Sequence, residues 1–512
     1  MKLLLAEQMH EVDQKAINLV GIPELVLMEN AGRAVAETVD TFLEGANGKR
    51  VVILTGKGNN GGDGLVAARL LEKLGAFVYV LLLEPAGKLS PSAAKELAIL
   101  KTFETRIYAW STQAAKQQQI MDLCAGADVV VDAMLGTGFK GSLRNTYAEA
   151  VEMINLLPVP VIAVDIPSGV EANTGKSDSG ALAAQLTVTM IAPKPGLYLY
   201  PGAQYTGDII VADLGTPEKL LDKAKTQLHL LEDEMIAELL PLRKVNAHKG
   251  NNGRIDIMAG NVGYVGAAVL SSSAAVRAGG GLVTLMTPEI VWPLLATKLN
   301  EVMVKPFNYD SLAKAVEETL DADVLVLGPG MGQAAETQKF IRNLLPEIGM
   351  PLLLDADALN ALAGHTSILR QVKNKVLTPH PGEMARLMGI STKEVLSAPM
   401  TNAAAMAKKW QAVVVLKCTP TIIAWPDGKI FLNSTGNEGM ATGGAGDVLT
   451  GVIAAFIGQG LSTEEAALCG VYVHGLAGDL AAQNGKIGLK AGDLVQYLPL
   501  AIKTILEGDN GD

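Results

Sequence analysis

The chain has 512 residues, a formal net charge of -11 at pH 7, and a content of 49% hydrophobic but only 4% aromatic residues. This acidic balance, without a long Lys/Arg cluster, excludes the broad positive field that nucleic-acid binding requires. No uncharged apolar run approaches the ~18 residues of a membrane helix, and the first residues become charged too soon for a signal peptide, so we expect a cytoplasmic protein without a membrane partner. An interior of Ala, Val, Leu and Ile is typical of buried parallel strands covered by helices, arranged in two or three domains.

The first part of the chain predicts a strand, a helix and a second strand around a glycine-rich loop. After a helical region at residues 7–45, a short apolar strand at 51–54 enters the loop TGKGNNGGDG at residues 55–64. A helix at 65–74 and a strand at 77–83 follow. In doubly wound sheets such a loop lies at the carboxyl end of its strand, where ligands bind.

The side chains of this loop exceed what a plain dinucleotide-binding loop needs. Its glycines match the G-x-G-x-x-G pattern, which works through bare backbone. Asn59, Asn60 and Asp63 are inserted among them and add oxygen ligands and hydrogen-bond donors. An alternative is that the asparagines only accommodate left-handed turn geometry. We favour a chemical role because one turn does not need three such side chains.

Polar side chains also follow two further predicted strands. One apolar strand leads into Asp132, and the next leads into Asp165 and Ser168. In a parallel sheet these side chains and Asn60 meet at one edge. Carboxylate, amide and hydroxyl oxygens together suit a hard cation, although aspartates also cap helices routinely.

The second half of the chain repeats the pattern of apolar strands that end in polar loops. Residues 216–234 form a charged, helix-prone connector, after which the new pattern begins. The strands and the loops that they enter are 324–327 with GPGMG, 352–354 with DADALN, 376–378 with PHPGE and 413–416 with KCTPT. This order predicts that His380, Lys417 and Asp447 lie on one side of a second parallel sheet.

A glycine-rich stretch at residues 436–451 enters a helix that we expect to begin near Asp447. The glycines Gly443, Gly444 and Gly446 leave backbone N–H groups uncovered at the helix N-terminus, which favours a phosphate or a developing phosphoryl charge. We expect the helix dipole to keep Asp447 ionised, as a base must be to take a proton from an attacking hydroxyl. The alternative, an N-cap with a tight turn, does not require six glycines in sixteen residues.

The motifs LMENAGRAVAE, GKGNNGGDG, DAMLGTGFKG and DIPSG within residues 1–214 resemble the epimerase domain of NAD(P)H-hydrate repair enzymes. That family interconverts the R and S forms of NAD(P)HX, the nicotinamide cofactors hydrated at C6. The resemblance implies a potassium ion at Asn60, Asp132 and Ser168, and an Asp165 that binds the substrate and moves a proton. It implies further substrate contacts at Asn59, Asn60, Gly61, Gly62, Asp63, Gly136, Thr137, Gly138, Phe139, Lys140, Gly141 and Ser142. Lys194, in PKPG, lies in another family-like stretch without a clear role.

The motifs HKGNNG, GYVGA, GPGMG, DADALN, TPHPGE and GMATGGAGDVLTG within residues 231–508 resemble the ribokinase-like NAD(P)H-hydrate dehydratases. In that family ADP in bacteria, with Mg²⁺, phosphorylates the hydroxyl of the hydrate, and loss of phosphate regenerates NAD(P)H. The resemblance implies that Asp447 is the base and that the hydrate contacts Ala267, Gly330, His380 and Asp447. It implies a nucleotide site at Lys417, Cys418, Thr419, Pro420, Thr421, Gly443, Gly444 and Gly446. Cys418 stands where glycine is commoner, so its side chain narrows the approach to the nucleotide.

The sequence thus predicts an α/β protein with a Rossmann-like, doubly wound epimerase domain at residues 1–215, a linker at 216–230 and a ribokinase-like dehydratase domain at 231–508. The expected function is bifunctional: exchange of the R and S epimers, and ADP-dependent dehydration of the S epimer to NAD(P)H, AMP and phosphate. We also expect a homo-oligomer. One alternative is a small-alcohol kinase fused to a dinucleotide-binding oxidoreductase module. Another is that the first domain only binds a ligand.

Overall fold

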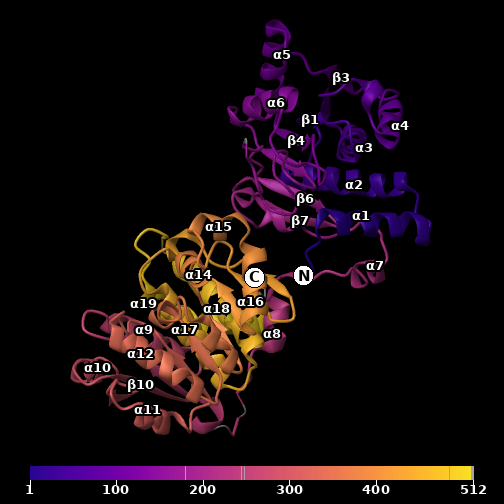
Figure 1. The fold of residues 1–512 in the computed structure, drawn as a ribbon. Coiled ribbons are helices and arrows are strands. Elements are labelled where there is room, and N and C mark those ends of the chain that lie inside the picture. The colour runs from indigo at the N-terminus through magenta and orange to yellow at the C-terminus, as the bar shows by residue number, and fades with distance from the viewer. Residues whose placement is uncertain (179, 244, 247, 484, 509–512) are drawn as a thin grey trace. The chain divides into compact units, whose positions relative to one another are not determined.

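A computed structural model describes residues 1–508 except 179, 244, 247 and 484 (Figure 1). The chain forms two compact units, one of residues Lys2–Leu228 and the other of Met1 with the residues from His229 onward. Among the described residues no helix is both long enough and apolar enough to cross a membrane.

The described residues of the first unit form a seven-stranded sheet in the order β3-β2-β1-β4-β5-β6-β7, in which every neighbouring pair is parallel. Its elements are α1 (Ala6–Lys15), a π-helical turn (Ala16–Val20), α2 (Glu24–Phe42), β1 (Arg50–Thr55), α3 (Asn59–Lys73), β2 (Phe77–Leu82), α4 (Pro91–Leu100), β3 (Arg106–Ala109), α5 (Ala114–Ala125), β4 (Val129–Ala133), α6 (Asn145–Asn155), β5 (Val161–Val164), β6 (Leu186–Met190), β7 (Asp208–Ala212) and α7 (Glu218–Asp222). The strand order reverses between β1 and β4, and this reversal opens a crevice at their carboxyl ends. The predicted Rossmann-like fold is confirmed.

Alternation along the strands divides the core of this unit into two layers. In β1, Val51 and Ile53 pack with apolar residues of α2, α3 and α4. Val52 and Leu54 face the other way and pack with residues of α5 and α6. Successive side chains of a strand point to opposite faces, so a strand that is apolar throughout needs helices on both sides.

The helix after β1 begins earlier than the sequence predicts. Helix α3 begins at Asn59, and the residues expected to form a loop occupy its first turns. The glycines there are buried and permit close packing: a Cβ on Gly61 would lie 2.2 Å from the carbonyl oxygen of Gly56, and one on Gly62 would lie 2.5 Å from Cε of Met28. Because glycine has a low intrinsic helix propensity, the sequence analysis predicted a loop here. Tertiary packing nevertheless makes these residues helical.

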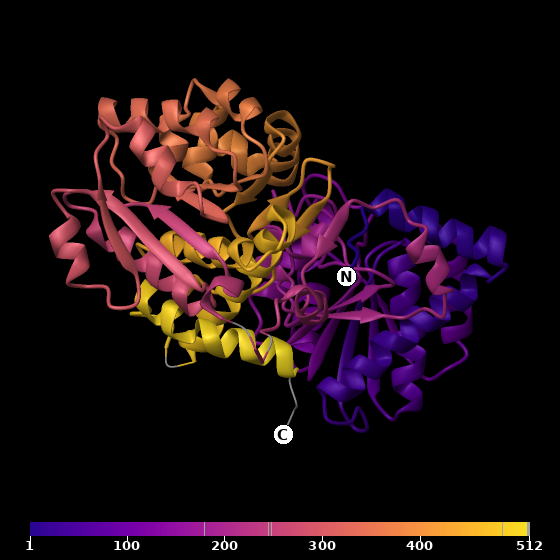
Figure 2. The same cartoon turned by 90° about the horizontal axis from the view of Figure 1, so that it is seen from below.

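The described residues of the second unit include a ten-stranded sheet in the order β11-β10-β9-β12-β13-β14-β15-β16-β17-β8. Its elements are β8 (Leu228–Leu230), α8 (Asp233–Leu239), β9 (Arg254–Met258), α9 (Val265–Arg277), β10 (Leu282–Pro288), α10 (Trp292–Ala296), β11 (Met303–Phe307), α11 (Leu312–Thr319), β12 (Val324–Leu327), α12 (Ala335–Leu344), β13 (Leu352–Leu354), α13 (Ala356–Ala361), β14 (Lys375–Leu377), α14 (Pro381–Met388), α15 (Thr392–Ser397), α16 (Pro399–Trp410), β15 (Val413–Leu416), β16 (Ile422–Ala424), β17 (Ile430–Leu432), α17 (Ala445–Gly458), α18 (Thr463–Ala482) and α19 (Ala491–Glu507). The strands from β11 to β15 are parallel, whereas β16 is antiparallel to both β15 and β17. Figure 2 shows this sheet between the yellow C-terminal helices and the orange helices on its other face.

Helix α17 is the central helix among those that cover one face of the second sheet. Every residue from Val448 to Gly458 is buried, against the sheet and against α9, α18 and α19. The contact with α9 depends on Gly451, where a Cβ would lie 2.0 Å from the carbonyl oxygen of Ser271. The helix begins at Ala445, two residues before the expected Asp447, so that Gly446 and Asp447 lie within its first turn.

The segment at residues 216–234, which the sequence analysis predicted as a single connector, contains separate helices and a strand. Helix α7 packs against α1, and β8 joins the second sheet beside β17. The change from one compact unit to the other falls between Leu228 and His229.

Candidate active sites

A cavity of about 890 Å³ opens in the first unit at the carboxyl ends of its central strands. Its size is within the range of small-molecule sites. The predicted residues that line it are Asn59, Asn60, Asp63, Gly136, Thr137, Gly138, Phe139, Lys140, Ser142 and Asp165. Gly61, Gly62 and Gly141 are not among its lining residues, and the first two serve the packing of α3 instead.

The side chain of Asn59 is held by two neighbouring elements. Its Nδ2 donates to Oε1 of Glu24 at 2.9 Å, and its Oδ1 accepts from Oγ of Ser90 at 3.0 Å. Glu24 is the first residue of α2, and Ser90 is the N-cap of α4. Asn59 therefore ties three helix N-termini together at the rim of the cavity.

The structure brings the three predicted cation ligands together. Oδ1 of Asp132 accepts from Oγ of Ser168 at 2.7 Å, and its Oδ2 accepts from the backbone N–H of Ser168 at 2.8 Å. The backbone of Leu135 connects Ser168 to Asn60. Its N–H donates to Oγ of Ser168 at 2.9 Å, and its carbonyl oxygen accepts from Nδ2 of Asn60 at 3.0 Å. Burial raises the pKa of Asp132 to about 6, although hydrogen bonds from Ser168 and Met134 lower it.

This donor set fits a hard monovalent or divalent cation. It consists of carboxylate, hydroxyl and amide oxygens, and Oδ1 of Asn60 accepts no hydrogen bond from the described part of the chain. Hard cations prefer such oxygen ligands, and a buried carboxylate gains stability from a positive charge beside it.

Asp165 follows β5 in a left-handed backbone conformation, with φ of 67°. Non-glycine residues rarely adopt this region, and it recurs at functional sites where the surroundings enforce it. Nζ of Lys194 donates to Oδ1 of Asp165 at 2.5 Å, and the lysine side chain is completely buried. The sequence reading left Lys194 without a role, and the structure assigns it to the aspartate.

Two residues of α1 that the sequence analysis did not single out also line the cavity. His10 and Asp13 lie three residues apart, beside the buried Met9 and Val12. Their spacing of three residues places both on one helix face, and this is the sequence pattern from which they could have been predicted. Burial raises the pKa of Asp13 to about 6, with a further increase from the charge of Asp165 and a decrease from Lys194. Burial also raises the pKa of Asp63 well above its usual range, as do the charges of Asp165 and Asp13.

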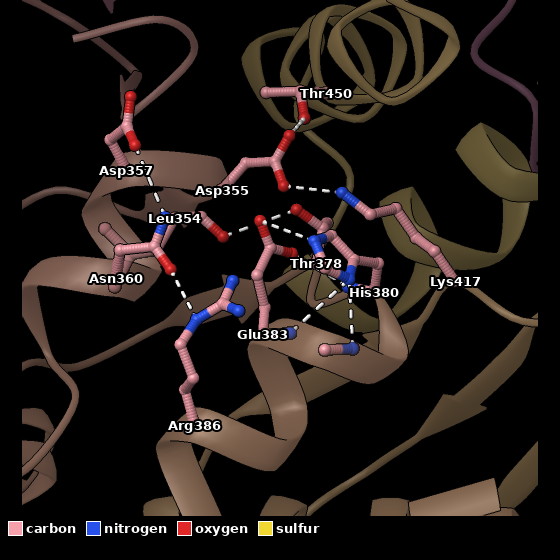
Figure 3. Close-up of polar contacts among 11 residues, drawn as sticks. Leu354, Asp355, Asp357, Asn360, Thr378, His380, Glu383, Arg386, Lys417 and Thr450 are labelled. Carbon is pink, nitrogen blue, oxygen red and sulfur yellow. Dashed lines mark hydrogen bonds and ion pairs between the residues drawn. The ribbon is translucent and has the colours of Figure 1, made fainter. Parts of the chain in front are cut away.

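In the second unit an ion pair lies next to the first turn of α17. Nζ of Lys417 donates to Oδ1 of Asp355 at 2.7 Å, and Oγ1 of Thr450 donates to Oδ2 of the same carboxylate at 2.8 Å (Figure 3). A Cβ on Gly446 would lie 3.3 Å from Nζ of Lys417. The lysine cation therefore adds to the positive end of the helix.

Asp447 has a higher pKa than the sequence analysis implied. Burial raises the pKa of Asp447 to about 7, and the charges of Asp355 and Asp357 contribute, whereas Lys417 lowers it. The helix dipole was expected to keep this carboxylate ionised, but burial and the charges of Asp355 and Asp357 oppose its ionisation. A pKa near the operating pH suits a general base.

Lys417 is held in its charged form by the surrounding carboxylates. Burial lowers the pKa of its ammonium, but Asp355, Glu383 and Asp447 raise it, with a net increase. The loop that follows Lys417 connects β15 to β16, and Sγ of Cys418 donates to the carbonyl of Pro420 at 3.2 Å. The Cys418 side chain is thus directed to its own loop.

His380 is the N-cap of α14 (Figure 3). Its Nδ1 accepts from the backbone N–H of Gly382 at 3.0 Å, and its Nε2 lies 3.5 Å from Oε1 of Glu383. Burial lowers the pKa of His380, as do Lys417 and Arg386, so the ring is neutral at pH 7. Burial raises the pKa of Glu383 to about 7. Half of the His380 side chain is exposed.

The remaining predicted hydrate contacts are also neighbours. A Cβ on Gly330 would lie 3.0 Å from Cβ of Ala267 and 2.8 Å from the carbonyl oxygen of Tyr264. Gly330 has φ of 61°, so both space and backbone conformation require glycine there.

His474 is a further residue that the sequence analysis missed: its Nε2 lies 2.9 Å from the carbonyl oxygen of Ala445 and fixes the start of α17.

The fold and these sites define a class: a two-domain α/β enzyme with a polar cavity on a Rossmann-like sheet and a glycine-rich helix N-terminus beside a lysine on a ribokinase-like sheet. Residues 24–196 match the family model described as YjeF-related protein N-terminus, and residues 255–500 match the model described as NAD(P)H-hydrate dehydratase. The bifunctional NAD(P)H-hydrate repair enzyme of Moorella thermoacetica is 42% identical over 99% of this chain and 98% of its own, and that of Escherichia coli is 35% identical over 99% and 95%. The chain belongs to the family of bifunctional NAD(P)H-hydrate repair enzymes.

A solved structure supports the assignment of the second unit. The ADP/ATP-dependent NAD(P)H-hydrate dehydratase of Bacillus subtilis, co-crystallised with ATP and Mg²⁺, is 33% identical with a TM-score of 0.50. The match covers 54% of this chain and 98% of that protein.

Proposed function

We propose that the chain repairs hydrated nicotinamide cofactors in two steps, with residues 1–215 as the epimerase domain and 231–508 as the ADP-dependent dehydratase domain. The first domain exchanges R- and S-NAD(P)HX, and the second converts the S epimer to NAD(P)H. Water adds to either face of C6, whereas a stereospecific dehydratase accepts one product, so an epimerase on the same chain rescues both. The cytoplasmic location and the homo-oligomer stay predictions.

In the epimerase domain the hydrated ring binds over the carboxyl end of β5. Asp165 moves the proton of the C6 hydroxyl, and Asn60, Asp132 and Ser168 would hold a potassium ion. When bound, the ion would supply positive charge at the strand ends where the substrate binds. Residues 136–140 and Ser142 form the opposite wall of the cavity.

In the dehydratase domain Asp447 takes the proton of the C6 hydroxyl, and the hydroxyl oxygen attacks the terminal phosphorus of ADP as AMP leaves. The amides of Gly443, Gly444 and Gly446 bind the charge that develops on the phosphoryl group, assisted by Lys417. Loss of phosphate from C6 and of a proton from C5 then forms the double bond of NAD(P)H. Phosphate leaves more readily than hydroxide, which explains the use of a nucleotide.

The Mg²⁺ ion would enter with the nucleotide. Among the described residues no group of three or more His, Cys, Asp or Glu side chains could hold a metal ion. Mg²⁺ is usually bound by one or two carboxylates together with substrate phosphates, so this arrangement is compatible with it.

The observation that carries the dehydratase proposal is the position of Asp447 in the first turn of α17, with Lys417 beside the same turn. An anion site, a cation and a carboxylate with a pKa of about 7 are together the components of phosphoryl transfer to a hydroxyl.

The test uses the full chain with a mixture of R- and S-NADHX, potassium, Mg²⁺ and either ADP or ATP, followed by NADH absorbance. Complete recovery of NADH with ADP supports both steps and the ADP donor. Recovery with ATP alone overturns the choice of ADP. Recovery of one epimer alone overturns the epimerase proposal, and no NADH with either nucleotide overturns the dehydratase proposal.

A further inference from the structure

Lys194 has no hydrogen-bond donor left for a substrate. Its completely buried ammonium donates to Oδ1 of Asp165 at 2.5 Å, to Oγ1 of Thr189 at 3.1 Å and to the carbonyl of Met190 at 3.1 Å. A lysine ammonium carries three N–H donors, and all three are used. Any effect of this residue on the reaction must therefore pass through Asp165.

The two oxygens of Asp165 have different surroundings. Oδ1 accepts from Lys194, from Oγ1 of Thr189 at 3.3 Å and from the backbone N–H of Met190 at 3.3 Å. Oδ2 accepts no hydrogen bond from the residues that the structure describes. Since Asp165 lines the cavity, Oδ2 is the oxygen available to a bound ligand.

Two carboxyl groups that interact with the charge of Asp165 belong to different helices, Asp13 to α1 and Asp63 to α3. Burial raises the pKa of both carboxyls, Asp13 to about 6 and Asp63 well above its usual range. His10 of α1 and Lys140 line the same cavity. Lys194 supplies the positive charge that contacts the carboxylate of Asp165 directly.

We infer that Lys194 is a positioning residue of the epimerase, which holds Asp165 by Oδ1 so that Oδ2 exchanges the proton of the C6 hydroxyl. The inference rests on the proposed epimerase function. In this step the O–H bond of the hydrate breaks and its proton bonds to Oδ2, while the C6–N1 bond breaks, its electron pair moves to N1 and C6 becomes a carbonyl carbon. N1 then closes on the opposite face of that carbon and reforms the C6–N1 bond, and Oδ2 returns the proton to the oxygen, so no further reactant is consumed.

The test compares Lys194→Met, Lys194→Arg and the unchanged chain in R-NADHX turnover between pH 5 and 9. An excess of the Asp165→Asn chain supplies dehydratase, so that epimerisation limits the appearance of NADH. We expect Lys194→Met to lower kcat about 100-fold with little change in KM, within the usual contribution of a positioned proton carrier. The acid limb of its pH profile should move up by at least about one unit, because the carboxylate has lost its ammonium partner.

Lys194→Arg keeps the charge and serves as the conservative variant. We expect it to recover part of kcat and to leave the acid limb where the unchanged chain has it. Lys140→Met removes a positive charge from the cavity wall without contacting Asp165, and we expect it to change KM without moving the limb.

A lower kcat in Lys194→Met with an unmoved acid limb, or a kcat equal to that of the unchanged chain, would overturn the inference while the epimerase function stands. An acid limb that moves as far in Lys194→Arg as in Lys194→Met would overturn the inference as well. If the methionine variant fails to fold, a shifted acid limb in Lys194→Arg relative to the unchanged chain still overturns it. Absence of epimerisation in the unchanged chain would overturn the proposed function itself.

Discussion

Both units place an aspartate and a lysine at the ends of parallel strands, but they connect the pair differently. In the first unit Lys194 binds the proposed proton carrier Asp165 directly. In the second unit Lys417 binds Asp355, and the carboxylate of Asp447 accepts no hydrogen bond from the residues that the structure describes. A lysine on the base fixes its geometry, whereas a lysine on a neighbouring carboxylate leaves the base adjustable in charge and position.

The glycines of the two glycine-rich segments also have different surroundings. Gly61 and Gly62 are buried and allow α3 to approach its neighbours. Gly443 has no atom within 4 Å of the place where a Cβ would lie. Gly61 and Gly62 of the first segment serve packing, whereas Gly443 of the second leaves space in front of backbone amides.

The largest expected effect separates the two aspartates. Asp447→Asn should lower dehydration at least about 1,000-fold and leave epimerisation intact, because the sites lie in different units. Asp165→Asn should do the reverse, so that only the S epimer is converted to NADH. Chromatographic epimer ratios and NADH absorbance measure the two activities separately. Loss of both activities in one folded variant would contradict the two-site arrangement.

The glycine comparison predicts opposite effects of the same substitution. Gly61→Ala should lower the free energy of unfolding of the first unit by about 2 kcal/mol, because its Cβ meets a backbone oxygen that cannot move aside. Gly443→Ala should leave stability unchanged and raise the KM for ADP about tenfold, since only a ligand can occupy that space. Urea unfolding and nucleotide titration measure the two effects. Destabilisation by Gly443→Ala would contradict the assigned role.

The pKa of Asp447 predicts the pH dependence of dehydration. The base must be ionised, and burial, with Asp355, raises its pKa to about 7. We expect kcat/KM for S-NADHX to fall below pH 7 and to be about tenfold lower at pH 6 than on the plateau above pH 8. The Asp447→Asn variant should lose this acid limb in its residual rate. A profile that is flat from pH 6 to 8 would contradict the assignment.

The smallest expected effect is on stability. Because the folded state raises the pKa of Asp447 from its ordinary value to about 7, the folded protein binds a proton that the unfolded chain has released between about pH 4 and 7. Stability from this group is therefore lost as the pH rises through that window. Asp447→Asn should stabilise the second unit by about 1 to 2 kcal/mol at pH 8 and not at pH 4. Thermal unfolding of both proteins at the two pH values measures the difference.

The strand-end pattern made the main convergence predictable from the sequence. Asn60, Asp132 and Ser168 meet because parallel strands end at one edge: Asp132 lies near the end of β4, and the other two follow the ends of β1 and β5 within five residues. The partner of Asp165 was not predictable in this way. Lys194 comes after an irregular stretch beyond β6, where neither period nor strand end indicates which side chain turns inward.

Environment was the second limit of sequence reasoning. The sequence identifies Asp447 as a carboxylate at a helix N-terminus, but its burial and the proximity of Asp355 depend on elements distant in the chain. The start of α3 was placed too late for a similar reason, since the partners that favour glycine there, Gly56 and Met28, are known only from the fold.

The contact between α17 and α9 has a consequence for the energy of the reaction. Gly451 allows the backbone of α17 to rest against the carbonyl of Ser271, and the helix has no room to shift in that direction. The amides at its start are therefore oriented before a ligand arrives, and little reorganisation energy is required when charge develops on the phosphoryl group. Part of the catalytic free energy is in this sense stored during folding, in a helix contact that no substrate touches.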